Sequence, residues 1–478
     1  MNITRRNVLQ GIAAGSALPT LPHAANLNTK SRPNILFIMV DQLHHKAISA
    51  LGNSNVNTPN IDRLIRSGTS FETCQCAAPV CIPCRGSLLS GRMPSETGIW
   101  INTAHQKSQG KLPRDIPNIG QWLQAQANYE TIYAGKYHLP HAHTYSIPGF
   151  EVIASGLEHR GDPGDSGVAR ACEAWLYNHQ SDRPFMMVCS LVNPHDVCHW
   201  LSINTDHSPD HLERYPLLED IAELPELPPN FSVDKSGESN RHHEIRTKQQ
   251  PTSGGWQQND WRYYLWAYYR QVEMVDAEIG HILDALETTG LDKNTLVVFT
   301  SDHGEGCGEH QMVRKGFLYD SAIRVPLVFS FPGKIAEGKT NKDGLTGSLD
   351  LMPTFCEFAG VPSPPELNHA QSLYPMLTGQ PGARLRDCVV TENNDPARDK
   401  PDATAAGRAL RTKKYKYITY FDQTVEQLFD MENDPGETIN LAGKSQYSSI
   451  LQEHRNKLKD WASALIPSSL LPPNPWIA

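Results

Sequence analysis

Short, uninterrupted apolar runs mark the strands that this sequence predicts. The run over 35–40 has no polar alternation, which is typical of a strand covered on both faces in a parallel sheet. Similar runs recur at 131–134, 185–191, 296–300 and 326–331. Apolar residues at helical spacing lie between the runs and predict helices over 119–126, 168–178, 261–286 and 349–358. The alternation predicts an α/β fold with a large, mostly parallel sheet sandwiched by helices.

Two later segments depart from this pattern. Residues 201–256 are rich in proline and charge and predict a long excursion over the surface, which could be functional or plain padding. A change in composition over 380–407 indicates a boundary, so we expect a catalytic domain over 26–380 and a C-terminal subdomain over 381–478. In the subdomain, 413–420 alternates polar and apolar residues like a half-exposed antiparallel strand, and 450–465 reads as an amphipathic helix.

The N-terminus has the pattern of an export signal. Arg5 and Arg6 precede a weakly apolar stretch over 11–21 that is too short to span a bilayer, and small residues follow at Ala24 and Ala25. This is typical of a twin-arginine signal peptide over 1–25, although a floppy basic terminus is the alternative. We therefore expect a bacterial periplasmic or secreted protein, carried out already folded by the Tat translocase.

Charge and cysteine content narrow the possible functions. The 478 residues include 43 Lys and Arg against 52 Asp and Glu, a net charge of -9, which argues against binding a phosphate backbone and leaves room for a local basic pocket. Apolar runs beyond the signal are too short for a polytopic membrane protein. The 10 cysteines could be disulfides, metal ligands or chemical groups, since an even number in an exported protein first suggests disulfides.

The sharpest motif is Cys81-Ile82-Pro83-Cys84-Arg85, followed by Gly91-Arg92. A redox pair or half of a zinc site fits poorly, because the thioredoxin-like context and a second ligand pair are missing. The motif resembles the signature of the type I, formylglycine-dependent sulfatases of the alkaline-phosphatase-like superfamily, with Cys84 at a position that is commonly Ser or Ala. The resemblance implies that a maturase oxidises Cys81 to formylglycine before export. Its gem-diol would attack sulfur, and Arg85 would hold the modified residue.

A second motif agrees with the first. Gly135-Lys136-Tyr137-His138 ends the strand predicted at 131–134 and resembles the family's Gly-Lys-x-His segment. A lone Lys-x-His is usually only a loop, but its place about 55 residues after Cys81 favours a functional interpretation. By the resemblance, Lys136 binds the sulfate and the nucleophile's oxygen, and His138 helps to deprotonate the diol when the aldehyde is regenerated.

Polar residues directly after two predicted strands suggest a metal site. Asp41-Gln42 follows the first strand, and Asp302-His303 follows the strand at 296–300, so both pairs should meet at one edge of the sheet. The resemblance implies that Asp41, Gln42, Asp302, His303 and the modified Cys81 hold one divalent cation that acts as a Lewis acid. Many relatives have Asp in place of Gln42 and Asn in place of His303. Oxygen-rich ligation favours Ca²⁺, with Mg²⁺ or Mn²⁺ as alternatives.

Further residues complete the expected pocket. His195, in Asn193-Pro194-His195-Asp196, matches a sulfate-binding histidine and is our candidate for the general acid that protonates the leaving oxygen. Lys315 matches a lysine that contacts sulfate. Candidate substrate-binding residues also include His310, Arg241 and His242. The aromatic side chains of 200–266 could form sugar platforms, although helix packing explains them more simply.

The resulting hypothesis is hydrolysis of sulfate esters that releases inorganic sulfate, from sulfated oligosaccharides or polysaccharides. A phosphonate monoester or phosphodiester hydrolase is the nearest alternative, and a non-catalytic sulfatase-like binding protein is a third. If Cys81 becomes formylglycine, nine cysteines remain and at least one is unpaired. Cys189 and Cys356 should be small core residues, and Cys74 and Cys76 either core residues or disulfide partners of distant cysteines.

Overall fold

The structure is a computed structural model in which most of the chain beyond the N-terminal segment is described. The described residues are 32–102, 112–140, 145–156, 160–203, 223–238, 240–381, 383, 386–393, 407–420 and 425–466. The predicted signal over 1–25 lies outside them. Within these ranges, none of the helices is both long and apolar enough to cross a membrane.

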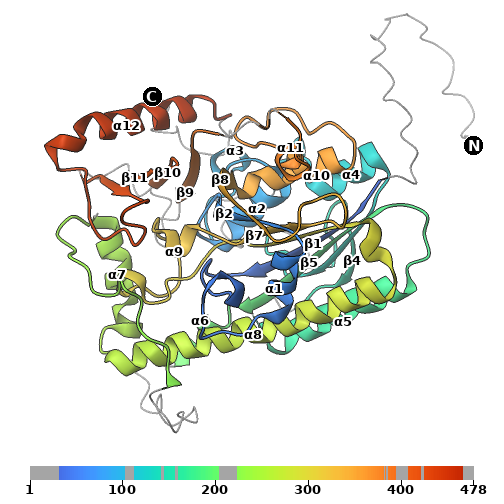
Figure 1. The fold of residues 1–478 in the computed structure, drawn as a ribbon, viewed down its shortest axis with the longest axis horizontal. Coiled ribbons are helices and arrows are strands. Elements are labelled where there is room, and N and C mark those ends of the chain that lie inside the picture. The colour runs from blue at the N-terminus through green and yellow to red at the C-terminus, as the bar shows by residue number, and fades with distance from the viewer. Residues whose placement is uncertain are drawn as a thin grey trace, which may run out of the picture.

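An eight-stranded sheet forms the centre of the molecule, with the strand order β4-β3-β5-β1-β6-β7-β2-β8 (Figure 1). Its strands are β1 (Asn34–Asp41), β2 (Thr69–Gln75), β3 (Glu130–Gly135), β4 (Glu151–Ala154), β5 (Phe185–Pro194), β6 (Thr295–Ser301), β7 (Leu327–Ser330) and β8 (Lys339–Gly347). Neighbouring strands are parallel except at β7, which runs antiparallel to β6 and β2. The predicted mostly parallel sheet is confirmed.

Helices cover both faces of this sheet, and β1 shows why its sequence does not alternate. Phe37 and its neighbours on one side belong to a core shared with α2 (Cys81–Ser90), α4 (Ile119–Ala127) and α10 (Leu351–Phe358). Ile38 and its neighbours on the other side belong to a second core, with α1 (Pro59–Arg66), α5 (Gly161–Asn178) and α8 (Gln258–Thr288). In Figure 1, α5 and α8 run together beneath the sheet. Each strand residue therefore meets apolar neighbours.

Shorter helical elements connect these layers. They are α3 (Pro94–Thr97), α6 (Val197–Ile203), α7 (Asn240–Ser253), α9 (Asp320–Ile323) and α11 (Tyr374–Leu377), with 3-10 turns at Ser49–Leu51, Leu291–Asn294, Glu309–Gln311, Ser348–Asp350 and Ser445–Tyr447. The prediction of a surface excursion over 201–256 is wrong for α7, which is helical and buries His242 and Ile245. Its polar side chains find partners on other segments, which composition does not reveal.

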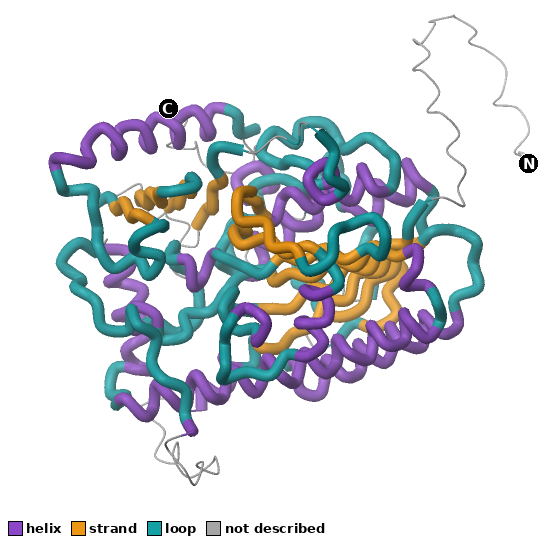
Figure 2. The backbone as a smooth tube through the Cα atoms, in the orientation of Figure 1, coloured by secondary structure: helices purple, strands orange, loops and turns teal. Residues whose placement is uncertain are grey.

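A smaller antiparallel sheet lies within 381–478, in the order β12-β11-β10-β9 (Figure 2). It comprises β9 (Val389–Asn393), β10 (Gly407–Arg411), β11 (Tyr415–Tyr420) and β12 (Gln427–Asp430), and α12 (Ser448–Ser463) packs on it. The half-exposed strand predicted at 413–420 is antiparallel but buried. Tyr417 faces α12, while the Lys416 ammonium turns to the catalytic part and pairs with Asp320 at 2.8 Å. The expected boundary between 380 and 381 stays a prediction.

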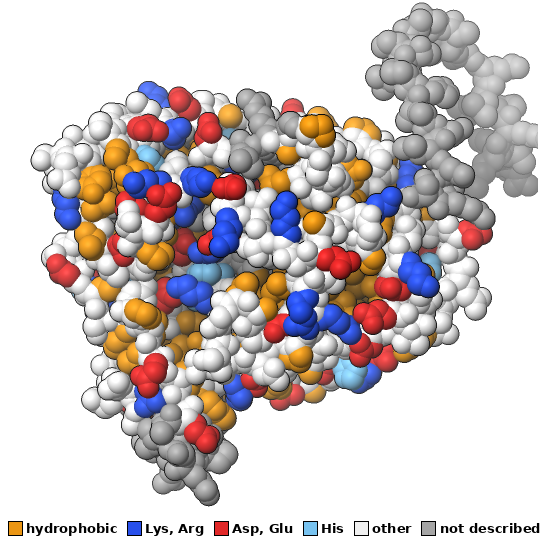
Figure 3. Space-filling model, viewed as in Figure 1, with side chains coloured by type: hydrophobic (Ala, Val, Ile, Leu, Met, Phe, Trp, Pro, Cys, Tyr) orange, Lys and Arg blue, Asp and Glu red, His pale blue; other side chains and the backbone are white. Residues whose placement is uncertain are grey.

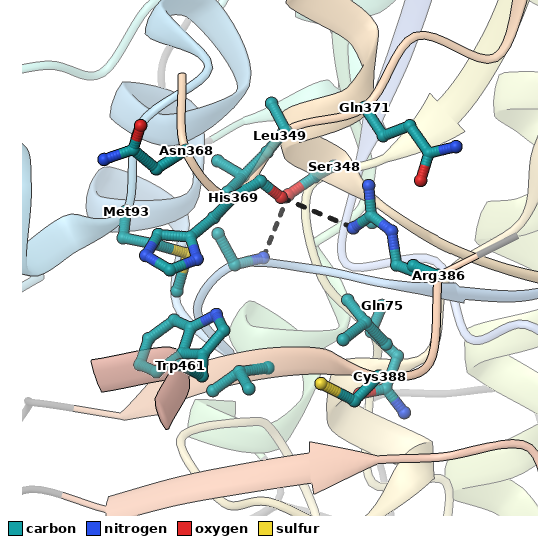
Figure 4. A pocket seen from close by; sticks show the side chains of 15 residues that line it. Gln75, Met93, Ser348, Leu349, Asn368, His369, Gln371, Arg386, Cys388 and Trp461 are labelled. Atoms are coloured by element: carbon teal, nitrogen blue, oxygen red, sulfur yellow. Dashed lines mark hydrogen bonds between the residues drawn. The ribbon is translucent and has the colours of Figure 1, made fainter. Parts of the chain in front are cut away.

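A pocket of about 210 Å³ marks the junction between the two parts (Figure 4). His369 and Trp461 lie on one side of it, with ring centroids 4.6 Å apart, and Arg386 lies opposite, bound to the buried Asp350. None of the residues that line it belongs to the buried group of Asp41, Cys81, Asp302 and His303.

All 10 cysteines of the chain are free in the structure. Cys189 and Cys356 are fully buried among apolar residues, as predicted. Cys74 and Cys76 are likewise core residues, so of the two roles left open for them the structure supports packing.

Candidate active site

The motif residues converge at the carboxyl edge of the large sheet. Asp41 ends β1, Lys136 follows β3, His195 follows β5, and Asp302 with His303 follows β6. Parallel strands place such residues side by side. Cys81 begins α2, which approaches from the face that carries α4 and α10. The sheet and one helix thus bring together residues that are up to 262 positions apart in the chain.

Four of these residues form a buried group that could hold a metal ion. One ligand atom from each of Asp41, Cys81, Asp302 and His303 lies within 4.8 Å of the others. The Cys81 Sγ is 3.1 Å from His303 Nε2 and 3.7 Å from Asp41 Oδ1. Gln42 adds an amide oxygen on the same side, where it accepts a hydrogen bond from the Lys315 ammonium. Carboxylate and amide oxygens with one imidazole fit a single divalent cation.

Arg85 organises the two carboxylates from inside α2. Its fully buried guanidinium donates to Asp302 Oδ2 at 2.8 Å and to Asp41 Oδ2 at 3.0 Å. It also donates to the Lys136 carbonyl oxygen at 2.7 Å and to Ser190 Oγ at 2.8 Å. Burial alone would lower the pKa of Arg85, but Asp302 and Asp41 raise it above its usual value. The planar guanidinium therefore fixes both carboxylates in one geometry.

Two lysines add positive charge at the same point. The Lys136 ammonium lies 2.8 Å from Asp41 Oδ2, and the Lys315 ammonium lies 3.1 Å from Cys81 Sγ. Burial and Asp41 raise the pKa of the Cys81 thiol. Lys315, Lys136 and His303 lower it by a larger amount, so that the pKa falls to about 5. Burial would also raise the pKa of Asp41, yet Lys136, with the other nearby cations, holds it well below its usual range. The site therefore stabilises negative charge at position 81.

The two remaining histidines of the predicted machinery lie at the same edge. His138 is buried and has a left-handed backbone with φ 54°. His195 follows the last residue of β5, and burial together with Lys315 and Lys136 holds its pKa well below the usual range. Its imidazole is consequently neutral at pH 7 before a ligand binds.

The three predicted substrate-binding residues outside the motifs are placed differently. His310 Nε2 lies 3.0 Å from the Gly436 carbonyl oxygen, and His242 Nε2 lies 3.1 Å from the Tyr420 hydroxyl. Both contacts belong to the junction with the C-terminal subdomain. The side chain of Arg241 lies outside the described residues. Trp200, Trp256, Trp261 and Tyr264 pack against one another, which supports the interpretation as helix packing.

Two buried carboxylates behind the site were not predicted. Glu305 accepts a hydrogen bond from the Gln42 amide. Asp165 accepts from the backbone N–H groups of Val192 and Asn193 at 2.7 and 2.8 Å, just before His195. The sequence holds one clue to the first, since Glu305 stands three residues after Asp302; it holds none to the second.

Comparison with known proteins identifies the class that this fold and site define. A buried group of residues that could hold a metal ion, together with cationic side chains at the sheet edge, is the arrangement of an alkaline-phosphatase-like hydrolase. The sulfatase family model matches residues 33–361, and a model described as the C-terminal part of N-sulphoglucosamine sulphohydrolase matches 308–464. The chain therefore belongs to the sulfatase family, enzymes that hydrolyse sulfate esters.

Individual relatives cover almost the whole chain. A Delta 4,5-hexuronate-2-O-sulfatase of Bacteroides thetaiotaomicron is 31% identical over 455 residues, which are 91% of this chain and 90% of the relative. The solved structure of a 2-O GAG sulfatase has a TM-score of 0.80 at 29% identity, with 93% and 96% of the two chains covered. A phosphonate monoester hydrolase of Agrobacterium radiobacter has a TM-score of 0.75 at 22% identity, covering 91% and 96%, and shares the fold.

Proposed function

We propose that this protein removes sulfate from 2-O-sulfated uronic acids in oligosaccharides, with residue 81 as formylglycine and one divalent cation at the sheet edge. The proposed reaction rests on one observation. Four possible metal ligands lie together with three cationic side chains; the ligands are Asp41, Cys81, Asp302 and His303, and the cations are Arg85, Lys136 and Lys315. The uronic acid is supported by the relative named a Delta 4,5-hexuronate-2-O-sulfatase, whose match covers 91% of this chain.

The residues of the site fit both a formylglycine at position 81 and a divalent cation. In the structure, the Cys81 thiol occupies the position that the hydrated aldehyde would take, and the nearby Lys315, Lys136 and His303, which lower the pKa of that thiol to about 5, support an anion there. Formylglycine would supply a hydroxyl nucleophile, and the sulfate transferred to it would later be expelled when the remaining hydroxyl loses its proton and the aldehyde forms again. A divalent cation held by Asp41, Gln42, Asp302 and His303, Ca²⁺ in our proposal, would supply Lewis-acid stabilisation of the sulfuryl oxygens.

The chain's own residues bind the ester and move protons. Lys136, which is paired with Asp41, and Lys315, which lies beside Cys81 Sγ, orient the sulfate by its oxygens. His195 donates a proton to the departing alcohol oxygen. Its low pKa in the free protein rises when the anionic ester binds, because a nearby negative charge favours the imidazolium. His138 accepts the proton of the remaining diol hydroxyl, and Arg85 keeps the two carboxylates in place.

Mass spectrometry of position 81 tests this proposal directly. The tryptic peptide over 67–85 contains Cys74, Cys76, Cys81 and Cys84, so three cysteines serve as internal controls. We expect active protein to have lost sulfur and gained an aldehyde oxygen at Cys81 alone. Fully active protein with an intact Cys81 thiol would contradict the proposal.

A substrate comparison separates the sulfatase from its nearest alternative. We expect turnover of an unsaturated 2-O-sulfated disaccharide to exceed that of a 6-O-sulfated glucosamine and of a phosphonate monoester at equal concentration. Preference for the phosphonate would assign the protein to the phosphonate monoester hydrolases instead. Binding without turnover of any ester would make it a sulfate-binding protein.

Export and maturation complete the proposal. Arg5 and Arg6 with the apolar stretch over 11–21 support transport by the Tat translocase to the periplasm or beyond. Because that route carries folded proteins, a formylglycine-generating enzyme or maturase would act on Cys81 before transport.

A further inference from the structure

The side-chain amide of Gln42 lies between two groups of opposite hydrogen-bonding character. Its Nε2 donates to Glu305 Oε2, and its Oε1 accepts from the Lys315 ammonium. An ammonium can only donate and a carboxylate can only accept, so the amide has a single satisfied orientation. That orientation directs the amide oxygen toward the Lys315 ammonium, which also lies 3.1 Å from Cys81 Sγ.

Glu305 is completely buried and is held by donors from three parts of the chain. Besides Gln42 at the end of β1, its carboxylate accepts from the Tyr264 hydroxyl of α8 and from the Arg314 backbone N–H. No lysine or arginine side chain in the described part of the chain forms an ion pair with it. A buried charge of this kind depends on its hydrogen bonds, so loss of one donor should disturb the others.

The segment that carries Lys315 needs such an anchor. Cys307, His310, Gln311 and Arg314 all have positive φ, between 47° and 62°, which is unfavourable for residues with a Cβ. The Gly306 N–H donates to the Arg314 carbonyl oxygen at 2.7 Å and closes the segment into a loop. Glu305 binds the N–H of the same Arg314, the residue directly before Lys315. One carboxylate therefore holds the Gln42 amide and the backbone that positions Lys315.

We propose that Glu305 is a positioning residue that sets the orientation of Gln42 toward the cation and the position of Lys315 beside residue 81. The inference rests on the proposed function, because it assumes the cation site. It also implies that positions 42 and 305 form a pair with one negative charge. An aspartate at 42 would face the Glu305 carboxylate, whereas a glutamine at 305 could donate to that aspartate and still accept from Tyr264 and Arg314.

Cation binding to the free protein tests the pair without relying on turnover. Ca²⁺, and separately Mn²⁺, is titrated calorimetrically into chelator-treated protein. In Glu305→Gln, the new side-chain amide N–H would face the amide N–H of Gln42, so two donors would oppose each other. If the Gln42 amide rotated to avoid this, its N–H groups would point toward the cation. We expect the affinity to fall by about 10- to 100-fold, the usual effect of losing a group that orients a metal ligand. Gln42→Asp should lose affinity as well.

The double variant decides between positioning and general damage. Gln42→Asp with Glu305→Gln restores one carboxylate facing one amide, so most of the wild-type affinity should return. At saturating Ca²⁺, kcat/KM for the sulfate ester should stay low in Glu305→Gln, because Lys315 is misplaced, and should recover in the double variant. If the single variants fold poorly, Tyr264→Phe removes one donor to Glu305 and should show smaller losses in both measurements.

A matched control is available in α8. The buried Asp276 carboxylate accepts from the N–H groups of Asn60 and Ile61, away from the site, so Asp276→Asn should lower the melting temperature and leave Ca²⁺ affinity unchanged. Wild-type affinity in Glu305→Gln, or losses that simply multiply in the double variant, would overturn the inference. Failure of the wild-type protein to bind either cation would instead overturn the proposed function.

Discussion

Replacing Arg85 by lysine should destabilise the protein strongly, although the charge is kept. The guanidinium makes four hydrogen bonds, to Asp302, Asp41, the Lys136 carbonyl and Ser190. A lysine ammonium is a compact donor and cannot reach two carboxylates and the opposite carbonyl together. If two of the four bonds are lost, at about 1.5–3 kcal/mol for each bond to a charged group, the free energy of unfolding should fall by about 3–6 kcal/mol.

The assay is urea unfolding followed by circular dichroism, with equal m-values required for the comparison. Arg92→Lys is the matched control, because Arg92 is also buried and donates to Glu366 at 2.9 Å and to the Pro365 carbonyl oxygen at 3.2 Å through a single nitrogen. A lysine can reproduce one such contact, so this variant should lose about 1 kcal/mol. An Arg85→Lys loss no larger than that of Arg92→Lys would refute the argument that the fork geometry of the guanidinium holds the site together.

Two further predictions concern the strand ends. Burial raises the pKa of Asp165 from 3.8 to about 7, so the folded protein keeps a proton that the unfolded chain loses, and stability should fall as the pH rises through this range. The stability advantage of wild type over Asp165→Asn should thus be larger at pH 5 than at pH 8 in urea unfolding, and an equal advantage would contradict this. Gly135→Ala should abolish activity and lower the melting temperature, because φ is 97° and a Cβ would lie 1.9 Å from the Ser190 carbonyl oxygen. The control Gly52→Ala, with φ 98° and open space around it, should lose only about 1–2 kcal/mol of stability and no activity.

The central strands could be predicted from the sequence because they are covered on both faces. β1 and β5 are buried along their whole length and therefore read as unbroken apolar runs. β2 and β8 were missed because their sequences, TSFETCQ and KTNKDGLTG, are polar. Pairing with β7 and β8 holds β2 in the sheet, and pairing with β2 holds β8. The helix α7 was missed for a related reason: Gln249 bonds both the N–H and the C=O of Val313, a contact across 64 residues that no local pattern shows.

The residues of the site also fall into a group that the sequence could predict and a group that it could not. The sequence could predict that Asp41, Lys136 and Asp302 lie close together, because each stands at the carboxyl end of a recognisable parallel strand. Glu305, in a loop, and Asp165, in α5, act through hydrogen bonds to segments elsewhere in the chain, and an acidic residue in either place usually means only a solvated surface. Residues proposed to perform the chemistry lie in recognisable motifs. Glu305 and Asp165, which support neighbouring segments, can be recognised only from the three-dimensional structure.

The charge balance of the site explains how an acidic protein can bind an acidic ester. Figure 3 shows positive and negative side chains intermixed over one face, so the net charge of -9 does not form a uniform field there. Inside, the carboxylates of Asp41, Asp302 and Glu305 are equal in number to the cationic side chains of Arg85, Lys136 and Lys315, although Glu305 is held by hydrogen bonds and not by an ion pair. Lys136 and Arg85 are paired directly with Asp41, but the nearest partners of Lys315 are the Gln42 amide and position 81. A divalent cation would make the balance positive, and that excess, together with Lys315, is what a sulfate monoester would meet. Because buried partners already fix these charges, little reorganisation would accompany the reaction.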